Sequence, residues 1–137
     1  MKLRCVLVAS LITLVLLSGC TYGGAFASAH QTNVEISESN FSIVATDVSG
    51  EASSSHLLGA SFSTGFYTES VGLIRLGGTG LLYQEALSDL WKNVEKKIGK
   101  IEGKSLALTN VRYDADCTNF FLFTSAKVVV RADVIEF

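Results

Sequence analysis

Few residues of this chain could do chemistry, and none of them forms a familiar catalytic or metal-binding motif. The sequence has two histidines, His30 and His56, and no His-x-x-x-His, Cys-x-x-Cys or Gly-x-Ser-x-Gly pattern. The sharpest metal hypothesis groups His56 with Asp114 and Asp116, since carboxylates at i and i+2 share one face of a strand. Oppositely charged cross-strand partners explain the carboxylates equally well. We therefore expect no catalytic residue, no cofactor and no metal site, with these three residues as weak metal candidates.

The start of the chain has the organisation of an export signal. A short basic stretch is followed by an apolar run over residues 6–17, which is too short to span a bilayer as a stable helix. The run ends with a small pair directly before a cysteine, Leu17-Ser18-Gly19-Cys20. This segment resembles the lipobox of bacterial lipoproteins, which implies that residues 1–19 are a signal peptide and that Cys20 is acylated. An ordinary signal with Cys20 as a bystander is the alternative.

Acylated Cys20 would attach the protein to a membrane. Each buried methylene contributes about 0.8 kcal/mol, so two or three acyl chains bind far more firmly than one. Thr21, rather than Asp, follows the cysteine. By resemblance to enterobacterial sorting rules, this residue favours the outer membrane if the bacterium has one. We therefore expect a lipid-anchored protein of the cell envelope.

Composition and charge limit what the rest of the chain can be. The 137 residues carry a formal net charge of −2, and the predicted signal peptide contains two of the basic residues, Lys2 and Arg4. Nucleic acid is not an expected partner, because phosphate binding needs clustered Lys and Arg, whereas this chain has a net negative charge. The length suits a single domain with one modest core. Cys117 is left without an intramolecular disulfide partner; we interpret it as a small buried hydrophobe, with pairing between chains or a nucleophilic role as alternatives.

Two hairpins and an insertion are predicted around one helix. Residues 20–32 are small and without period, which indicates a flexible tether before a single domain at 33–137. Alternating apolar residues predict a first hairpin that begins near Asn33. Residues 59–80 mix apolar residues with Gly and Ser without a clean period. We expect an apolar, Gly-rich insertion there that folds back on the domain or meets a partner.

A helix is predicted from about Leu82 onward, with Thr79 as its N-cap. Apolar residues recur at spacings of three and four, and acidic residues lie early and lysines late, in agreement with the helix dipole. The predicted core stripe consists of Leu82, Ala86, Leu90, Val94 and Ile98, with Leu87, Trp91 and Ile101 beside it.

The chain after the helix alternates again and predicts a second hairpin with a loop at 118–123. Charge favours the register that opposes Asp114 and Lys127, because the neighbouring registers oppose two basic residues. Aromatic residues in this loop either fold onto the domain or form a contact point for a partner or for the lipid surface. They are Phe120, Phe121 and Phe123.

These elements have the order β-β-α-β-β and predict an α+β fold, in which one amphipathic helix packs on one face of an antiparallel sheet of about four strands. Several segments resemble an uncharacterised family of small bacterial lipoproteins: Thr32-Asn33-Val34-Glu35-Ile36, Asn40-Phe41, Ala107-Leu108-Thr109-Asn110-Val111 and residues 130–137. The resemblance covers most of residues 32–137 and implies a lipid-anchored envelope protein of unassigned role, with no catalytic residues to transfer. The element order also resembles small oligomeric dodecin-like and metal-binding domains, which is a likeness of fold alone.

Three classes of function are compatible with these predictions. A binding or structural module at the membrane surface needs only the anchor, the domain and the apolar insertion, and it is the function we expect. A small-ligand or metal-binding protein, assembled as a homo-oligomer through its strand edges, is the alternative. An enzyme would need a base and a nucleophile that the sequence does not bring together. The expected partners are the membrane, reached through Cys20, and a protein partner or a second copy of the chain.

Overall fold

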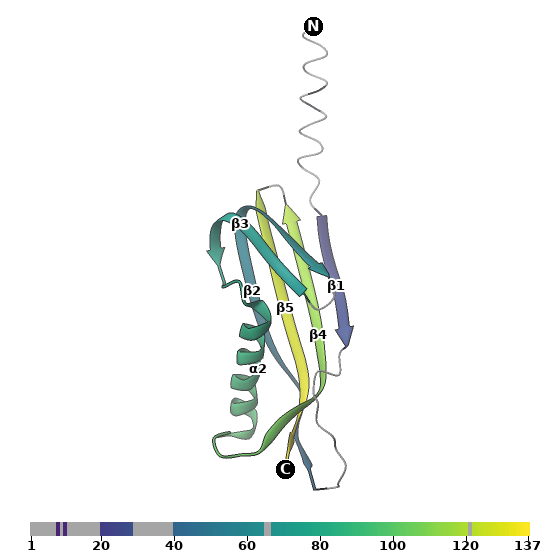
Figure 1. Ribbon diagram of the computed structural model, residues 1–137, viewed down its shortest axis with the longest axis vertical. Helices are drawn as coiled ribbons and strands as arrows, with labels where there is room; N and C mark the ends of the chain where they lie inside the picture. The colour runs from purple at the N-terminus through teal and green to yellow at the C-terminus, as the bar shows by residue number, and fades with distance from the viewer. Residues whose placement is uncertain (1–7, 9, 11–19, 29–39, 65–66, 121) are drawn as a thin grey trace.

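Figure 1 shows the computed structural model of the chain, which describes residues 8, 10, 20–28, 40–64, 67–120 and 122–137. The elements are, in chain order, β1 (Cys20–Ser28), β2 (Ser42–Thr64), β3 (Tyr67–Gly77), α2 (Leu82–Ile98), β4 (Leu106–Phe120) and β5 (Phe123–Glu136). The strands form one antiparallel sheet in the order β1-β4-β5-β2-β3. Strands β2 to β5 and the helix confirm the predicted α+β class and the order β-β-α-β-β, and β1 adds a strand at one edge.

Strand β1 occupies most of the segment for which the sequence predicts a flexible tether. Its backbone pairs with β4, and Cys20 lies opposite Asn119. The tether prediction is therefore wrong for residues 20–28. An edge strand needs only backbone hydrogen bonds to its neighbour, and these do not require an apolar period in the sequence. Residues 29–39, which include the first strand of the predicted first hairpin, lie outside the described part of the chain.

Strand β2 is long because it takes part in two pairings in turn. Residues 42–57 pair with β5, and residues 55–64 pair with β3. Near Leu57 the strand bends over the end of the sheet, and the β2–β3 hairpin crosses the face that α2 also covers (Figure 1). The predicted insertion at 59–80 is thus the outer part of this hairpin and the turn into the helix, and it folds back on the domain.

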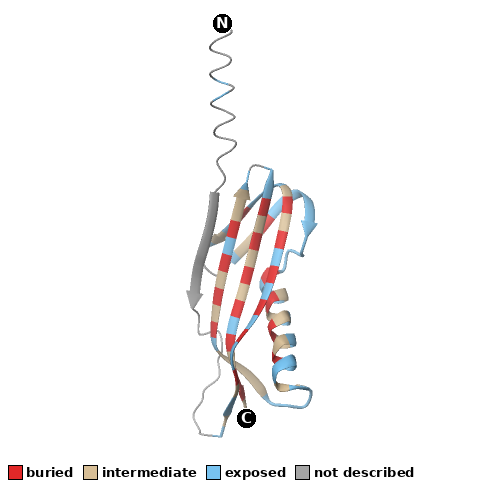
Figure 2. Cartoon of the chain, turned by 180° about the vertical axis from the view of Figure 1, so that it is seen from behind, coloured by how far each residue is buried: buried red, intermediate tan, exposed pale blue. Residues whose placement is uncertain are grey.

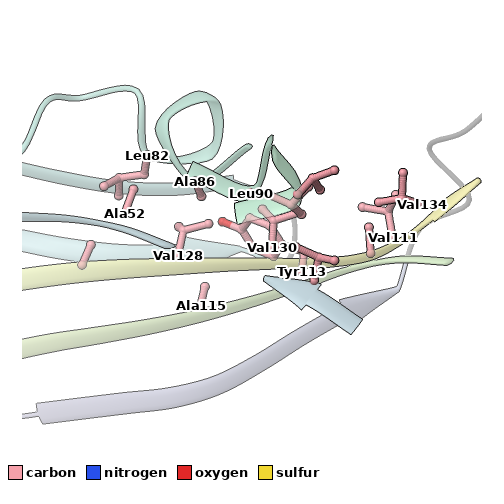
Figure 3. Packing of buried hydrophobic residues seen from close by; sticks show 14 of the residues in the cluster. Ala52, Leu82, Ala86, Leu90, Val111, Tyr113, Ala115, Val128, Val130 and Val134 are labelled. Atoms are coloured by element: carbon pink, nitrogen blue, oxygen red, sulfur yellow. The ribbon is translucent and has the colours of Figure 1, made fainter. Parts of the chain in front are cut away.

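The hydrophobic core lies between the helix and the sheet (Figure 3). Trp91 is only partly buried at the rim of this core. The residue before the helix is Leu81 rather than the predicted Thr79, although the Thr79 hydroxyl accepts a hydrogen bond from the Leu81 N–H at 3.2 Å. The predicted stripe is confirmed at the four buried residues of the helix, Leu82, Ala86, Leu90 and Val94, whereas Ile98 is only partly buried against the core.

The helix and the sheet come closest together at Gly50 of β2. A Cβ atom at this position would lie 2.1 Å from both the Ala86 carbonyl oxygen and the Leu90 nitrogen. These atoms belong to the helix backbone, so they cannot rotate out of the way as the end of a side chain would. Glycine at position 50 therefore sets the distance at which the helix packs on the sheet.

The β4–β5 hairpin has a different register from the predicted one. Lys127 lies opposite Asp116 rather than Asp114. The strands continue as far as Phe120 and Phe123, which lie opposite each other, so a tight turn replaces the predicted loop at 118–123. Buried and less buried residues alternate along both strands (Figure 2). The error is a shift of two residues, which keeps the same faces buried and so leaves the apolar pattern satisfied.

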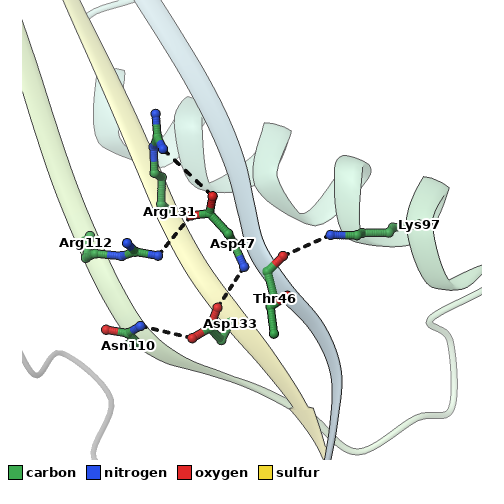
Figure 4. Close-up of polar contacts among 7 residues, drawn as sticks. All are labelled: Thr46, Asp47, Lys97, Asn110, Arg112, Arg131 and Asp133. Atoms are coloured by element: carbon green, nitrogen blue, oxygen red, sulfur yellow. Dashed lines mark hydrogen bonds and ion pairs between the residues drawn. The ribbon is translucent and has the colours of Figure 1, made fainter.

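A third strand explains why this register is stable although it places Arg112 opposite Arg131 (Figure 4). The Asp47 carboxylate of β2 lies 2.9 Å from Arg112 Nη2 and 3.9 Å from Arg131 Nη1. Asp133 in turn accepts hydrogen bonds from the Asp47 N–H at 2.8 Å and from Asn110 Nδ2 at 3.0 Å. Asp47 and Asn110 both have positive φ, where β2 and β4 bulge on either side of β5. Asp47 thus offsets the repulsion between Arg112 and Arg131. That repulsion disfavours this pairing only when β4 and β5 are considered without β2.

Candidate functional site

The three weak metal candidates lie on opposite faces of the sheet. His56 is buried on the face that the helix and the hairpin cover, whereas Asp114 and Asp116 alternate with the buried residues of β4 and face the other side. The structure therefore does not bring them together. Across the described ranges, no group of three or more His, Cys, Asp or Glu side chains is placed to hold a metal ion.

His56 makes structural contacts within the hairpin. Its Nδ1 lies 2.9 Å from Ser70 Oγ, and Arg75 Nε donates to its Nε2 at 3.3 Å. Because a guanidinium group only donates, Nε2 is the acceptor and Nδ1 carries the proton that faces Ser70. Both partners belong to β3, so the imidazole joins the two strands where β2 bends.

Two other ionisable side chains, those of Cys117 and Tyr113, are buried in the core. Cys117 is buried in a strand, as predicted, and burial raises its pKa. Burial also raises the pKa of Tyr113, whose hydroxyl donates to Thr68 Oγ1 at 2.5 Å. Both groups therefore stay protonated at neutral pH.

A shallow hollow with a volume of about 280 Å³ lies between the start of β3 and the start of α2. Tyr67, Tyr83 and Tyr113 line it, and the ring centroids of Tyr83 and Tyr113 are 6.1 Å apart. Small-molecule sites typically have volumes of about 300–1,000 Å³, so this hollow is at the lower limit of that range. Its size suits a small planar group rather than an extended ligand.

The β4–β5 turn and the bend of the β2–β3 hairpin lie at the same end of the sheet (Figure 1). Several apolar side chains of these segments are exposed. Leu57 of β2 lies opposite both Phe123 and Ile74, so one position joins the turn to the hairpin. Phe121, one of the predicted contact residues, lies outside the described part of the chain. We name this surface the apolar end; its members are Leu58, Leu73, Ile74, Phe120, Leu122 and Phe123.

The apolar end carries almost no charge. Asp, Glu, Lys and Arg are absent from residues 52–68 and 117–126, and Arg75 is the one such residue in 70–80. The opposite end of the molecule is strongly charged. Exposed charged residues lie there in the last turn of α2 and in the segment after it; they are Lys96, Lys97, Lys100, Glu102 and Lys104. A cluster of exposed apolar side chains without charge is typical of an interaction surface.

A partly buried polar cluster lies beneath the apolar end and joins the hairpin to the sheet. The Asn119 carboxamide accepts hydrogen bonds from the Ser61 N–H at 2.7 Å and from Thr124 Oγ1 at 2.8 Å, and it donates to the Ser61 carbonyl at 2.8 Å. Ser61 Oγ also donates to the Ser125 carbonyl at 3.0 Å. Ser61 and Thr124 are buried, so water does not compete for these bonds. The polar cluster therefore fixes the shape of the surface above it.

Cys20, the predicted lipidation site, lies at this same end of the molecule. It is the first residue of β1 and is paired with Asn119, the neighbour of Phe120 in β4. Adjacent strands are about 4.8 Å apart and each residue advances about 3.3 Å. The backbone of Cys20 therefore lies within about 6 Å of the backbone of Phe120.

The sequence predicts one part of the apolar end but not the other. Phe120 and Phe123 are exposed next to the turn. For Leu58, Leu73 and Ile74 the sequence assigns no face, because their segment has no clean period. The available signal was the apolar content of residues 59–80, which indicates contact but does not say with what.

Comparison with known proteins adds a family but no function. No helix within the described residues is long and apolar enough to cross a membrane. No curated protein and no solved structure matches the chain. A family described as a family of unknown function (DUF6567) matches residues 1–137, which is the length of the sequence. The apolar end, the polar cluster beneath it and Cys20 at its side are thus features of a chain that belongs to the family of unknown function DUF6567.

Proposed function

We propose that this protein is a lipid-anchored module of the bacterial cell envelope, with a binding or structural role at the membrane surface. One observation carries the proposal: the cysteine that ends the lipobox-like segment is also the first residue of β1, beside the apolar end. A domain that begins at its acylated cysteine has no spacer, so its first strand is held at the membrane. By the sorting rule that Thr21 matches, that membrane is the outer membrane where the bacterium has one.

The substitution Cys20→Ala tests the attachment. The wild-type protein should mature to a chain whose N-terminal residue is acylated Cys20, visible by mass spectrometry, and should partition into detergent. Cys20→Ala should accumulate as an unprocessed precursor without lipid label. Cys117→Ala is the matched control, since this cysteine is buried and its replacement should leave the label in place. Unchanged labelling of Cys20→Ala, or a mature N-terminus at another residue, would refute the proposal.

A small-ligand-binding module is the second candidate, and the hollow between Tyr67, Tyr83 and Tyr113 is the observation that favours it. Aromatic side chains offer faces on which a planar ligand can stack. The test is chemical-shift mapping by NMR with a panel of planar aromatic fragments. Shifts confined to residues around the hollow, and abolished by Tyr83→Ala, would support this role. A panel that leaves these resonances unmoved would count against it.

A further inference from the structure

We propose that the apolar end rests directly on the lipid bilayer, so that the strands run away from the membrane and the charged end faces the aqueous phase. This inference rests on the proposed attachment of Cys20 and goes beyond it, because it names the surface that meets the bilayer. In Figure 1 the strands run along the long axis of the molecule, and the C-terminus lies at the other end. The protein would therefore stand on the membrane in one defined orientation.

The position of Cys20 is the first argument. Acyl chains on this cysteine would place its backbone at the boundary between headgroups and hydrocarbon. Because Cys20 pairs with Asn119, Phe120 and the turn that follows it are held within about two residue spacings of that boundary. The described strand pairing leaves no flexible segment between the attachment point and the sheet that would let the end move away.

The composition of the surface is the second argument. Residues 71–76 are exposed on both faces of β3, so their apolar side chains are not needed by the core. Burial of this end in the interface would desolvate a single charged residue, Arg75. Its Nε already donates to His56, and its long side chain can keep the rest of the guanidinium group among lipid headgroups. The charged end, with its exposed lysines, would be a poor alternative for insertion into hydrocarbon.

The bilayer is a better occupant than a protein partner for a geometric reason. A partner seated on the apolar end would have to occupy the space next to the acyl chains of Cys20, where lipid is already present. The hydrogen-bonded cluster of Asn119, Ser61 and Thr124 also gives this surface a fixed shape, so it does not need a partner to become ordered. The lipid surface requires no further component.

Single-tryptophan variants test the orientation. In a Trp91→Phe background, Leu122→Trp places the fluorophore at the apolar end, and Phe137→Trp places it at the other end, where the Phe137 N–H bonds to the Ser105 carbonyl. Leu122 and Phe137 are similarly exposed, at 45% and 49%. The full acylated protein is reconstituted into vesicles of phosphatidylethanolamine and phosphatidylglycerol with brominated acyl chains. We expect several-fold stronger quenching of the tryptophan at 122 than of the one at 137.

Controls on the same samples separate the two proposals. Mass spectrometry of the N-terminus is read first: an unacylated Cys20 overturns the anchoring proposal, and this inference with it. In an acylated sample, equal quenching at the two positions, or none at 122, overturns the inference alone. So does an unquenched tryptophan at 122 in a protein that crosslinks through this end to another envelope protein. Should Trp91→Phe fail to fold, hydrogen exchange of the wild-type protein must show vesicle-dependent protection at residues 57–60 and 122–123 but not at 99–105.

Discussion

Helix α2 and the β2–β3 hairpin cover neighbouring parts of the same sheet face, but the side chains beneath them differ in kind. Under the helix, the buried side chains of β2 and β5 are aliphatic, and Gly50 lets the two backbones approach. Under the hairpin, the structure buries polar groups that hydrogen-bond across strands. Within the described residues, the buried polar side chains are Ser54, His56, Ser61, Ser70 and Thr124.

The two parts of the sheet face have different roles: one mainly stabilises the fold and the other mainly specifies its shape. Burial of apolar side chains contributes a large free energy that does not depend on direction. The part under the helix therefore supplies most of the stability. Hydrogen bonds contribute less in net free energy but specify geometry, so the part under the hairpin fixes where β2 bends and where β3 lies. Polar groups occupy much of the space beneath the hairpin, and its exposed apolar side chains Leu58, Leu73 and Ile74 form part of the apolar end.

The largest effect should follow from Gly50→Ala, in the part under the helix. The added Cβ overlaps backbone atoms of Ala86 and Leu90, so helix and sheet must separate. We expect a loss of about 3 kcal/mol or more in the free energy of unfolding, at or above the upper end of typical overpacking. Gly77→Ala is the control, since a Cβ there meets only Ser55 Oγ at 3.8 Å. Denaturant unfolding measures both, and a wild-type midpoint for Gly50→Ala would contradict the close packing.

A smaller loss should follow from Asn119→Ala, in the part under the hairpin. The substitution leaves the buried backbone N–H and carbonyl of Ser61 without their partners, which costs about 2–3 kcal/mol. Asn93→Ala is the matched control, since the Asn93 amide donates to the Ser49 carbonyl in an exposed position and should contribute less. Hydrogen exchange should show that Asn119→Ala loosens β3 before it loosens α2. Uniform loosening of both would remove the distinction between the two parts.

An effect of intermediate size should follow from Asp133→Ala, on the exposed face of the sheet. The Asp47 N–H and the Asn110 amide donate to the Asp133 carboxylate and hold its pKa below the ordinary value. We expect Asp133→Ala to lose about 1 kcal/mol, because these bonds are exposed to solvent. The loss should be full above about pH 4, the ordinary pKa of Asp, and should vanish as the pH falls through the lowered folded pKa. Glu102→Ala should follow the wild-type profile, and a pH-independent loss in Asp133→Ala would exclude a charged role.

The smallest effect on stability should come from Phe120→Ser combined with Phe123→Ser. Both side chains are exposed, so we expect the free energy of unfolding to change by less than about 0.5 kcal/mol per site. Association of the acylated protein with vesicles should weaken despite the unchanged melting temperature. A large fall in the melting temperature would show that these rings pack in the fold. The distinction between inward polar and outward apolar groups would then not hold at this end of the molecule.

The part under the helix could be read from the sequence because its signal is local. The spacing of Leu82, Ala86, Leu90 and Val94 identifies the buried face of one helix without reference to any other element. The alternation in β4 and β5 likewise predicts which faces are buried. The fold class follows from these two observations.

The remaining features depend on partners that are distant in sequence. The pairing of Arg112 with Arg131 in the last hairpin is offset by Asp47, which belongs to neither of its strands. Strand β1 has no apolar period and is defined by its pairing with β4. The inward polar cluster joins Ser61 to Asn119, and no spacing rule connects these two residues.

The pairing of β1 with β4 also has a consequence for the order of folding. Cys20 and Asn119 lie in the first and the second-to-last strands, so the chain must close a loop around most of the domain before they meet. β1 should therefore join the sheet last, and until it does the edge of β4 is open to incorrect pairing. If the chain leaves an export channel N-terminus first, β1 would have no strand to pair with until β4 emerges. Pulse-labelled hydrogen exchange during refolding should show β1 amides protected only after those between β2 and β5.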